Sequence, residues 1–264
     1  MLRSLVGSEM CIRDSGMVVV SGPTGSGKST SLYAALKEIK SERTNITTVE
    51  DPVEYQLDGV NQVQVFEDIG LTFGSTLRSI LRQDPDVLLI GEIRDGETAD
   101  IAVKFALTGH LVFSTVHAND APGTITRLLD IGIAPFLVGS CLNLVMAQRL
   151  VRRICKNCKN EYAPTNEELA LVGLDSSKVS GPLFKGEGCA ECRNTGYKGR
   201  LAIFEMIPMA RDLRKLVFDN ANEDEIRTAS LNNGMTTLRE AGLARVLDGT
   251  TSIQEILRST VEDL

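Results

Sequence analysis

A glycine-rich stretch, GPTGSGKST over residues 22–30, has residue types and spacing that bind phosphate. Small residues let successive backbone N–H groups turn inward around phosphate oxygens, and a helix that follows adds the positive end of its dipole. In this pattern Lys28 contacts the β- and γ-phosphates and Ser29 binds the Mg²⁺ that bridges them. The expected nucleotide-binding residues are Gly22, Thr24, Gly25, Ser26, Gly27, Lys28, Ser29 and Thr30.

The patterns on either side of this loop predict an α/β fold. Residues 17–20 are apolar and β-branched, as in a buried parallel strand, and strand and helix patterns alternate up to about residue 150. This alternation predicts a parallel sheet with helices on both faces. The expected strands are 17–21, 45–49, 86–90 and 110–116; the expected helices are 28–40, 74–83, 96–107 and 122–131.

Two acidic stretches follow predicted strands. Glu92 comes two residues after the apolar run 87–90, where a carboxylate can face a γ-phosphate. Gly91 occupies the place where an aspartate is usual, so we expect metal contact through water and a role for Glu92 on the attacking water. The stretch VEDPVEY contains three further acids, of which Glu50 is favoured for Mg²⁺ or water, with a solvated loop as the alternative. We expect residues 53–65, VEYQLDGVNQVQV, to form a hairpin-like excursion that turns at Asp58–Gly59.

The chain has two histidines, both near one predicted strand. His110 and His117 are seven residues apart, so strand alternation places them on opposite faces and at most one needs to face a nucleotide. His117 lies at the strand end, before a capped helix, where a γ-phosphate sensor would be placed. A purely structural role is the alternative.

Four cysteines form two pairs with metal-ligand spacing. Cys155 and Cys158 make one C-x-x-C pair, and Cys189 and Cys192 make the other. Tetrahedral Zn²⁺ on four thiolates is the natural interpretation in a cytosolic chain, and unmetallated thiols are the alternative. Cys141, in an apolar stretch expected to be helical, is predicted to be a small core residue.

Composition limits the class of protein. The chain has 264 residues, 42% of them hydrophobic, and a formal net charge of −7. It has no apolar run of about 18 residues, so we expect a soluble, cytosolic protein. The acidic balance disfavours broad nucleic-acid binding. The expected division is a non-native leader over 1–14, a P-loop core over 15–150, a cysteine-bearing insertion over 151–205 and a helical subdomain over 206–264.

Taken together and in this order, the motifs resemble the secretion ATPases of type II secretion and type IV pilus assembly. They are GPTGSGKST, VEDPVEY, LRQDPDVLLIGEIRD, TGHLVFSTVHAND and the four-cysteine insertion, and the resemblance covers Gly16 to about Leu257. It implies a RecA-like homo-hexameric motor that hydrolyses ATP, works with a platform protein at the inner membrane and drives pilin extraction or polymerisation. It places the family's Walker A lysine on Lys28, its acidic box on Glu50 to Glu54, its catalytic glutamate on Glu92 and its histidine-box sensor on His117. It places the zinc ligands on the four paired cysteines.

Two features refine this interpretation. Retraction members of the family lack the cysteine insertion, which favours assembly or export. Full-length members carry a preceding domain that supplies arginines to the site; here Arg78, Arg82 and Arg94 are the possible phosphate or subunit contacts. A zinc-ribbon nucleic-acid translocase and a nucleotide-binding scaffold without turnover remain the alternatives, although no nucleic-acid partner is expected.

Overall fold

The computed structural model describes residues 15–174, 179 and 181–260, so the expected leader at 1–14 lies outside the described residues. The described chain divides into two compact units. The first contains residues 15–24, 28–147 and 206–235; the second contains residues 25–27, 148–205 and 236–260. Residues 206–235 therefore group with the predicted P-loop core, whereas 236–260 group with the cysteine-bearing segment.

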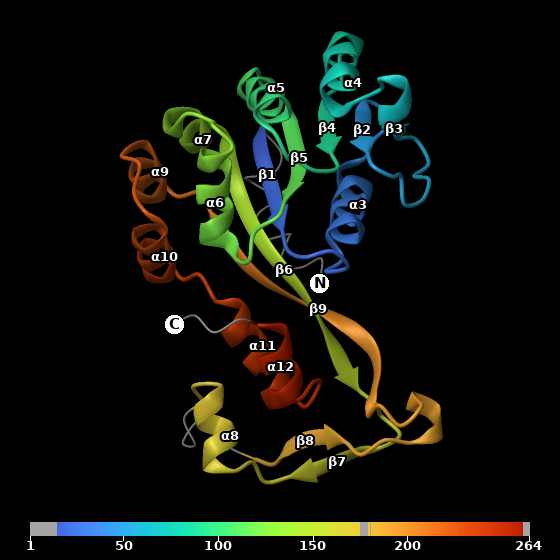
Figure 1. Cartoon of the computed structure of the whole chain (residues 1–264), viewed down its shortest axis with the longest axis vertical. Coiled ribbons are helices and arrows are strands. Elements are labelled where there is room, and N and C mark those ends of the chain that lie inside the picture. Colours follow the sequence, from blue (N-terminus) through green and yellow to red (C-terminus); the bar gives the residue numbers. More distant parts are fainter. Residues whose placement is uncertain (1–14, 175–178, 180, 261–264) are drawn as a thin grey trace. The chain divides into compact units, whose positions relative to one another are not determined.

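A seven-stranded sheet has the order β3-β2-β4-β5-β1-β6-β9 (Figure 1). Its strands are β1 (Gly16–Ser21), β2 (Ile46–Glu50), β3 (Asn61–Gln64), β4 (Val87–Ile90), β5 (Leu111–Val116), β6 (Leu142–Ile154) and β9 (Tyr197–Pro208). The pairs from β3 to β6 are parallel. All residues of β1, β4 and β5 are buried, as their apolar runs require in a sheet covered on both faces. The predicted mostly parallel sheet is confirmed.

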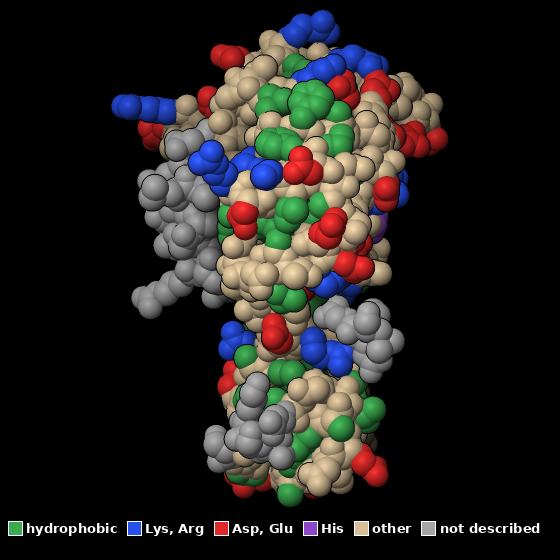
Figure 2. Space-filling view, turned by 90° about the vertical axis from the view of Figure 1, so that its left-hand side faces the viewer, with side chains coloured by type: hydrophobic (Ala, Val, Ile, Leu, Met, Phe, Trp, Pro, Cys, Tyr) green, Lys and Arg blue, Asp and Glu red, His purple; other side chains and the backbone are tan. Residues whose placement is uncertain are grey.

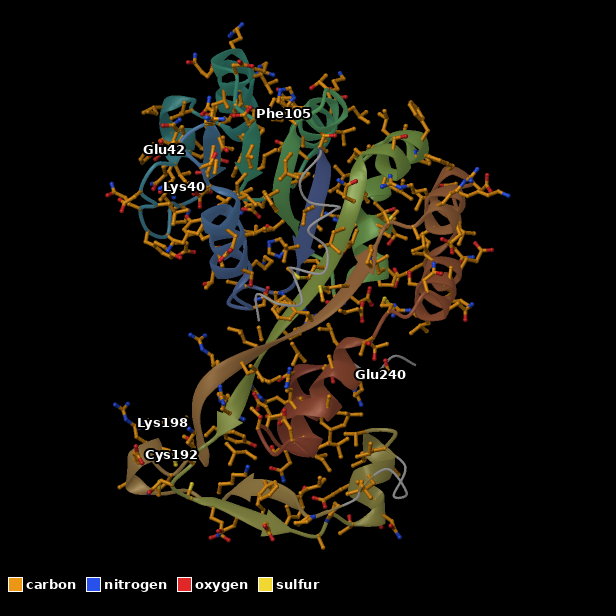
Figure 3. All side chains as sticks on the ribbon, turned by 180° about the vertical axis from the view of Figure 1, so that it is seen from behind. Lys40, Glu42, Phe105, Cys192, Lys198 and Glu240 are labelled. Atoms are coloured by element: carbon orange, nitrogen blue, oxygen red, sulfur yellow. The ribbon has the colours of Figure 1, made fainter. Side chains whose placement is uncertain are left out.

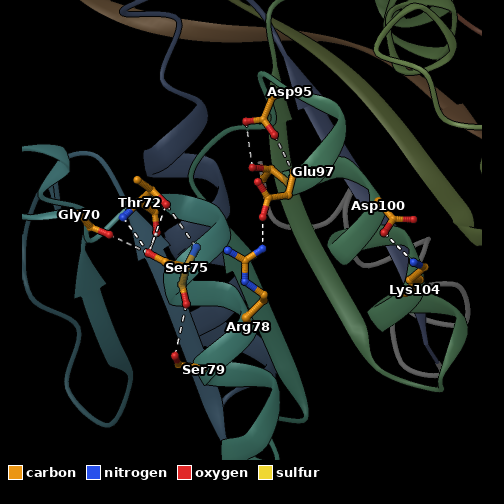
Figure 4. Close-up of polar contacts among 10 residues, drawn as sticks. Gly70, Thr72, Ser75, Arg78, Ser79, Asp95, Glu97, Asp100 and Lys104 are labelled. Carbon is orange, nitrogen blue, oxygen red and sulfur yellow. Dashed lines mark hydrogen bonds and ion pairs between the residues drawn. The ribbon is translucent and has the colours of Figure 1, made fainter.

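Helices of the first unit pack on this sheet or on one another. They are α3 (Lys28–Ile39), α4 (Phe73–Ile80), α5 (Gly96–Leu107), α6 (Ala121–Asp130), α7 (Pro135–Cys141), α9 (Arg211–Phe218) and α10 (Glu223–Asn232), with the 3₁₀ turns η1 (Glu67–Ile69) and η2 (Leu81–Gln83). Helix α5 contacts β1 and β5, and α6 contacts β1. The Asp95 side chain caps the first turn of α5, and Thr72 forms a capping box with Ser75 at α4 (Figure 4). Cys141 is buried at the end of α7, as predicted, and burial raises the pKa of its thiol to about 12.

The hairpin-like excursion after β2 is a wrong prediction. Strand β3 pairs with β2 in parallel, with Thr47 opposite Asn61. Residues 51–60 carry the chain back to the start of β2 before β3 begins, so the two strands run in the same direction. Gly59, at the predicted turn, has a φ of 68° and therefore still provides a turn within this connection.

The second unit contains the latter part of β6, a two-stranded antiparallel sheet and three helices. The sheet pairs β7 (Lys159–Tyr162) with β8 (Leu183–Gly186); the helices are α8 (Asn166–Leu171), α11 (Leu238–Leu247) and α12 (Ile253–Ser259), with the 3₁₀ turn η4 (Ala190–Cys192). Thr165 and Thr237 form capping boxes with Glu168 and Glu240 at the starts of α8 and α11. Ser252 caps α12 through the backbone N–H of Glu255, and the Glu255 carboxylate binds Arg152 and Arg258.

Within the described part of the chain, every helix is too short or too polar to cross a lipid bilayer.

Candidate functional site

Three loops leave the sheet at one edge. Ser21, the last residue of β1, lies opposite Val116, the last residue of β5. Ile90, the last residue of β4, lies opposite Ser114 of β5. Since parallel strands end at the same edge, the glycine-rich loop after β1 leaves the sheet beside the loops that contain His117 and Glu92. The register therefore brings these predicted site residues to one edge.

The glycine-rich loop has the backbone that its sequence requires. Gly22, Gly25 and Gly27 have φ values of 143°, 78° and 87°, which residues with a side chain rarely adopt. The Nζ atom of Lys28 donates to the carbonyl oxygens of Gly22 at 2.8 Å and Pro23 at 3.1 Å, so the lysine spans the loop. At the start of α3, the next two residues, 29 and 30, are exposed, which leaves their hydroxyls open to a metal ion or phosphate.

Glu92, His117 and Arg94 form a cluster at this edge. The Glu92 side chain is only 12% exposed, and its Oε2 atom lies 3.4 Å from Nε2 of His117. Its Oε1 atom forms an ion pair with Arg94, and the hydrogen bond to Glu92 raises the pKa of the Arg94 guanidinium. A carboxylate and an imidazole held this close can orient a water molecule between them and an incoming phosphate.

Hydrogen bonds between β4 and β5 fix the position of Glu92. The Ser114 hydroxyl donates to the Ile90 carbonyl at 3.0 Å, and the Thr115 hydroxyl donates to the Gly91 carbonyl at 2.7 Å. The Ile93 N–H donates back to the Thr115 carbonyl at 2.9 Å. Our sequence analysis did not single out Ser114 or Thr115, although two hydroxyl residues inside an otherwise apolar strand were the available signal.

Glu50 lies at the end of β2 but in a different environment. It is 4% exposed and accepts hydrogen bonds from the hydroxyls of Tyr33 and Thr48, the latter at 2.5 Å, and from the Gln62 amide at 3.2 Å. Burial, followed by the hydrogen bond to Glu50, raises the pKa of Tyr33. Among the described residues, these contacts hold the carboxylate against α3 and β3, and none joins it to Glu92 or His117. Its proposed part in binding metal or water stays a prediction.

The three arginines predicted as possible phosphate or subunit contacts lie in different surroundings. Arg94 binds Glu92, as described above. Arg78, on α4, forms an exposed ion pair with Glu97 on α5 (Figure 4). Arg82 is exposed in η2. The structure therefore brings only Arg94 to the Glu92 cluster.

His110 lies at the other end of β5 from His117. Its ring stacks on Phe105, which Figure 3 labels, with 4.1 Å between the ring centroids. Its Nδ1 atom is 3.1 Å from the Thr108 hydroxyl. Packing and a hydrogen bond to its own helix–strand connection account for this histidine, so His117 is the one at the carboxyl edge of the sheet.

The four paired cysteines come together in the second unit. Their Sγ atoms all lie within 4.8 Å of one another, and the measured Sγ–Sγ distances are 3.9 Å for Cys155–Cys189, 3.8 Å for Cys158–Cys192 and 3.7 Å for Cys189–Cys192. A tetrahedron with Zn–S bonds of about 2.3 Å has edges of about 3.8 Å. The spacing of these sulfurs therefore fits a tetrahedral zinc ion.

Hydrogen-bond donors around the cluster favour the thiolate forms of Cys189 and Cys192. The N–H groups of Cys189 and Gly196 donate to Sγ of Cys192 at 3.2 and 3.3 Å, and the Asn157 amide donates to Sγ of Cys189 at 3.5 Å. Burial opposes ionisation of Cys192, but the two N–H donors, together with hydrogen bonds from the neighbouring thiols, outweigh it and lower the pKa to about 6. Figure 3 labels Cys192 and the nearby Lys198, which pairs with Glu191.

The mainly parallel sheet with a glycine-rich loop at its carboxyl edge defines an α/β protein of the nucleotide-binding type. The family model "Type II/IV secretion system protein" matches residues 7–258. The chain belongs to this family.

Curated relatives from type IV pilus assembly and from type II secretion are similar over nearly the whole chain. The type IV pilus assembly ATPase PilB of Myxococcus xanthus is 50% identical over 95% of this chain and 45% of its own length. The type II secretion system protein E of Pseudomonas aeruginosa is 47% identical over 94% of this chain and 49% of its own length. The chain thus spans less than half the length of these relatives.

Solved structures have the same fold. The pilus retraction motor PilT with bound ADP matches with a TM-score of 0.72 and 27% identity, covering 98% of this chain and 65% of PilT. The ATPase DotB of Legionella pneumophila matches with a TM-score of 0.68 and 20% identity, covering 96% of this chain and 62% of DotB. The second likeness shows the fold alone.

Proposed function

We propose that the chain is the ATP-hydrolysing motor portion of a machine that assembles type IV pili or the pseudopili of type II secretion. Family membership and relatives named as ATPases support this assignment. The observation that carries it is the Glu92–His117 pair, which lies at the sheet edge where the glycine-rich loop leaves β1. A loop that binds phosphate and a carboxylate that can orient water are the two parts that phosphoanhydride hydrolysis needs.

Each residue has a definite part in this proposal. Lys28 binds the terminal phosphates of ATP, and the Ser29 hydroxyl holds Mg²⁺, which neutralises phosphate charge when it is bound. Glu92 orients the attacking water, and His117, beside it, senses the γ-phosphate. Glu50 is proposed to assist with metal or water, which would require it to exchange some of its present contacts with Tyr33 and Thr48.

The cysteine cluster is proposed to hold one structural Zn²⁺. Cys155, Cys158, Cys189 and Cys192 supply four sulfurs at tetrahedral spacing, and two backbone N–H groups donate to Sγ of Cys192. Four protein ligands complete the coordination of zinc and leave no position for a reacting water. The ion would therefore stabilise the fold of the second unit.

The full-length protein is proposed to work as a homo-hexamer on the cytoplasmic face of the inner membrane, held there by a platform protein. The choice of assembly over retraction rests on sequence, since the fold is shared with a retraction motor. The chain is 50% identical to an assembly ATPase and 27% identical to the retraction motor. The cysteine insertion supports the same choice.

Phosphate release, measured together with size-exclusion chromatography with and without ATP, tests this proposal. We expect ATP turnover that increases with assembly. Binding and assembly with no turnover would favour a nucleotide-gated scaffold. Tight binding of a DNA oligonucleotide at physiological salt would favour a translocase instead.

A further inference from the structure

A buried glutamine contacts the glycine-rich loop from the middle of β6. Gln148 is 1% exposed, and its Nε2 atom donates to the Ser26 carbonyl oxygen at 2.8 Å. Ser26 is itself 3% exposed, so this hydrogen bond is shielded from water. Both residues belong to the second unit, which includes loop residues 25–27.

The loop backbone is shaped around this glutamine. A Cβ atom added at Gly27 would lie 3.0 Å from Nε2 of Gln148 and 3.6 Å from Cδ1 of Leu150. The φ of 87° at Gly27 also disfavours any side chain. Glycine at this position therefore serves two purposes: the turn itself and the close approach of Gln148.

The hydrogen bond determines which way one peptide group faces. The Ser26 carbonyl and the Gly27 N–H belong to the same planar trans peptide unit, so they point in opposite directions. Because Gln148 holds the carbonyl on its own side, the Gly27 N–H points away from Gln148. Inward-facing N–H groups are what a phosphate-binding loop offers to its ligand.

We propose that Gln148 is a positioning residue for this loop: its amide holds the Ser26 carbonyl outward and so presents the Gly27 N–H to the phosphate of an incoming nucleotide. This inference rests on the proposed function, since it assumes that the loop binds nucleotide. Two buried oxygens at the contact, Oε1 of Gln148 and Oγ of Ser26, lack a hydrogen-bond partner among the described residues. These two oxygens are therefore available to form hydrogen bonds when a nucleotide is bound to the loop.

The test compares Gln148→Met with a matched control on the same strand. Gln148→Met keeps the length of the side chain and removes the donor. Val151→Ala removes buried volume from β6 at a fully buried position whose side chain points to the opposite face from Gln148 and Leu150. The readouts are the dissociation constant for ADP and amide hydrogen exchange of residues 22–31 without nucleotide.

We expect Gln148→Met to weaken ADP binding about tenfold, because a loop that is pre-oriented only part of the time binds in proportion to that fraction. Its loop amides exchange faster, while Val151→Ala changes neither readout by more than about twofold. Equal effects of the two substitutions, or no effect of Gln148→Met, would overturn the proposal. Failure of the wild-type chain to bind ADP would instead overturn the proposed function.

Gln148→Glu provides a second test should the methionine variant not fold. An ionised carboxylate repels the Ser26 carbonyl, whereas a protonated carboxyl can donate to it in place of the amide. Burial raises the pKa of such a carboxyl, so its protonation falls in an accessible pH range. The ADP affinity of this variant, relative to wild type, is expected to rise as the pH falls. A ratio that does not change with pH would overturn the proposal.

Discussion

Glu92 and His117 lie 3.4 Å apart, Oε2 to Nε2, at the ends of two adjacent parallel strands. The two residues are 25 positions apart in the chain, and the register of β4 against β5 brings them together. The contacts with the His117 imidazole and the Arg94 guanidinium hold the Glu92 carboxylate in one orientation.

Replacement of His117 by glutamine is expected to lower ATP turnover by roughly a hundredfold, as the loss of one oriented group at a reacting phosphate does. Nucleotide affinity should change far less, because the side chain is placed to act on the γ-phosphate only. Steady-state phosphate release and ADP titration measure the two quantities. His110→Gln is the matched control, since His110 packs on Phe105 at the other end of β5 and should affect stability alone. Equal losses of turnover in both variants would contradict the sensor role.

Substitutions at the Arg78–Glu97 ion pair distinguish a stabilising role of Arg78 from a contact with phosphate or a neighbouring subunit. Both side chains are more than half exposed, so breaking the pair should change the free energy of unfolding by less than about 1 kcal/mol. Glu97→Ala breaks the pair and keeps the guanidinium, whereas Arg78→Ala removes it. If Arg78 reaches phosphate or a neighbouring subunit, Arg78→Ala lowers turnover and Glu97→Ala does not. The same turnover in both variants would show that Arg78 contacts neither phosphate nor a neighbouring subunit.

The proximity of Glu92 and His117 could be predicted from sequence because it depends on local patterns. Apolar runs mark β4 and β5, and parallel strands release their loops at one edge, so Glu92 and His117 could be placed together. The helix expected over 96–107 matches α5 residue for residue. Its Asp95 cap and its regular apolar spacing are signals confined to one short segment.

The remaining contacts could not be predicted because their partners are distant in sequence. Gln148 meets Ser26 across 122 positions, and Arg152 meets Glu255 across 103. No local pattern records such a pairing. The sequence places Glu50 at a strand end, but it does not indicate that Tyr33 and Gln62 bind the carboxylate there. The direction of β3 likewise depended on the path of a ten-residue connection that carries no periodic signal.

The cysteine cluster is expected to bind one zinc ion per chain. Elemental analysis of protein purified without added metal measures this directly. Chelation should unfold the second unit before the first, because structural zinc sites contribute on the order of 10 kcal/mol or more to folding. Cys189→Ser should lose the metal, while Cys141→Ala, at a buried cysteine outside the cluster, should keep it. Well under one zinc per chain after reduction and zinc titration would contradict the proposal.

Glu255 should make the second unit sensitive to acid. Burial opposes its ionisation, but hydrogen bonds from Arg258 and Arg152 outweigh this and lower its pKa from 4.5 to about 2. Its contribution to the free energy of unfolding is therefore fully present above pH 4.5 and is lost as the pH falls toward 2. The shift corresponds to roughly 3 kcal/mol.

Glu255→Gln should remove that amount of stability at pH 7 and flatten the acid dependence below pH 4.5. Urea unfolding across this pH range measures both effects. Glu191→Gln is the control, because the Glu191–Lys198 pair is exposed and should contribute little. Identical acid profiles for Glu255→Gln and wild type would show that another carboxyl is responsible.

In the proposed function, the glycine-rich loop binds the nucleotide while Glu92 acts on the water that attacks it. Titration of ATP binding together with single-turnover hydrolysis in Lys28→Ala and Glu92→Gln tests it most directly. Lys28→Ala removes the positive charge that contacts the bound phosphates and should lose affinity for ATP. Glu92→Gln should keep an ATP affinity near that of wild type and lose turnover by roughly a hundredfold or more. Equal loss of ATP affinity in both variants, or undiminished turnover in Glu92→Gln, would contradict the account.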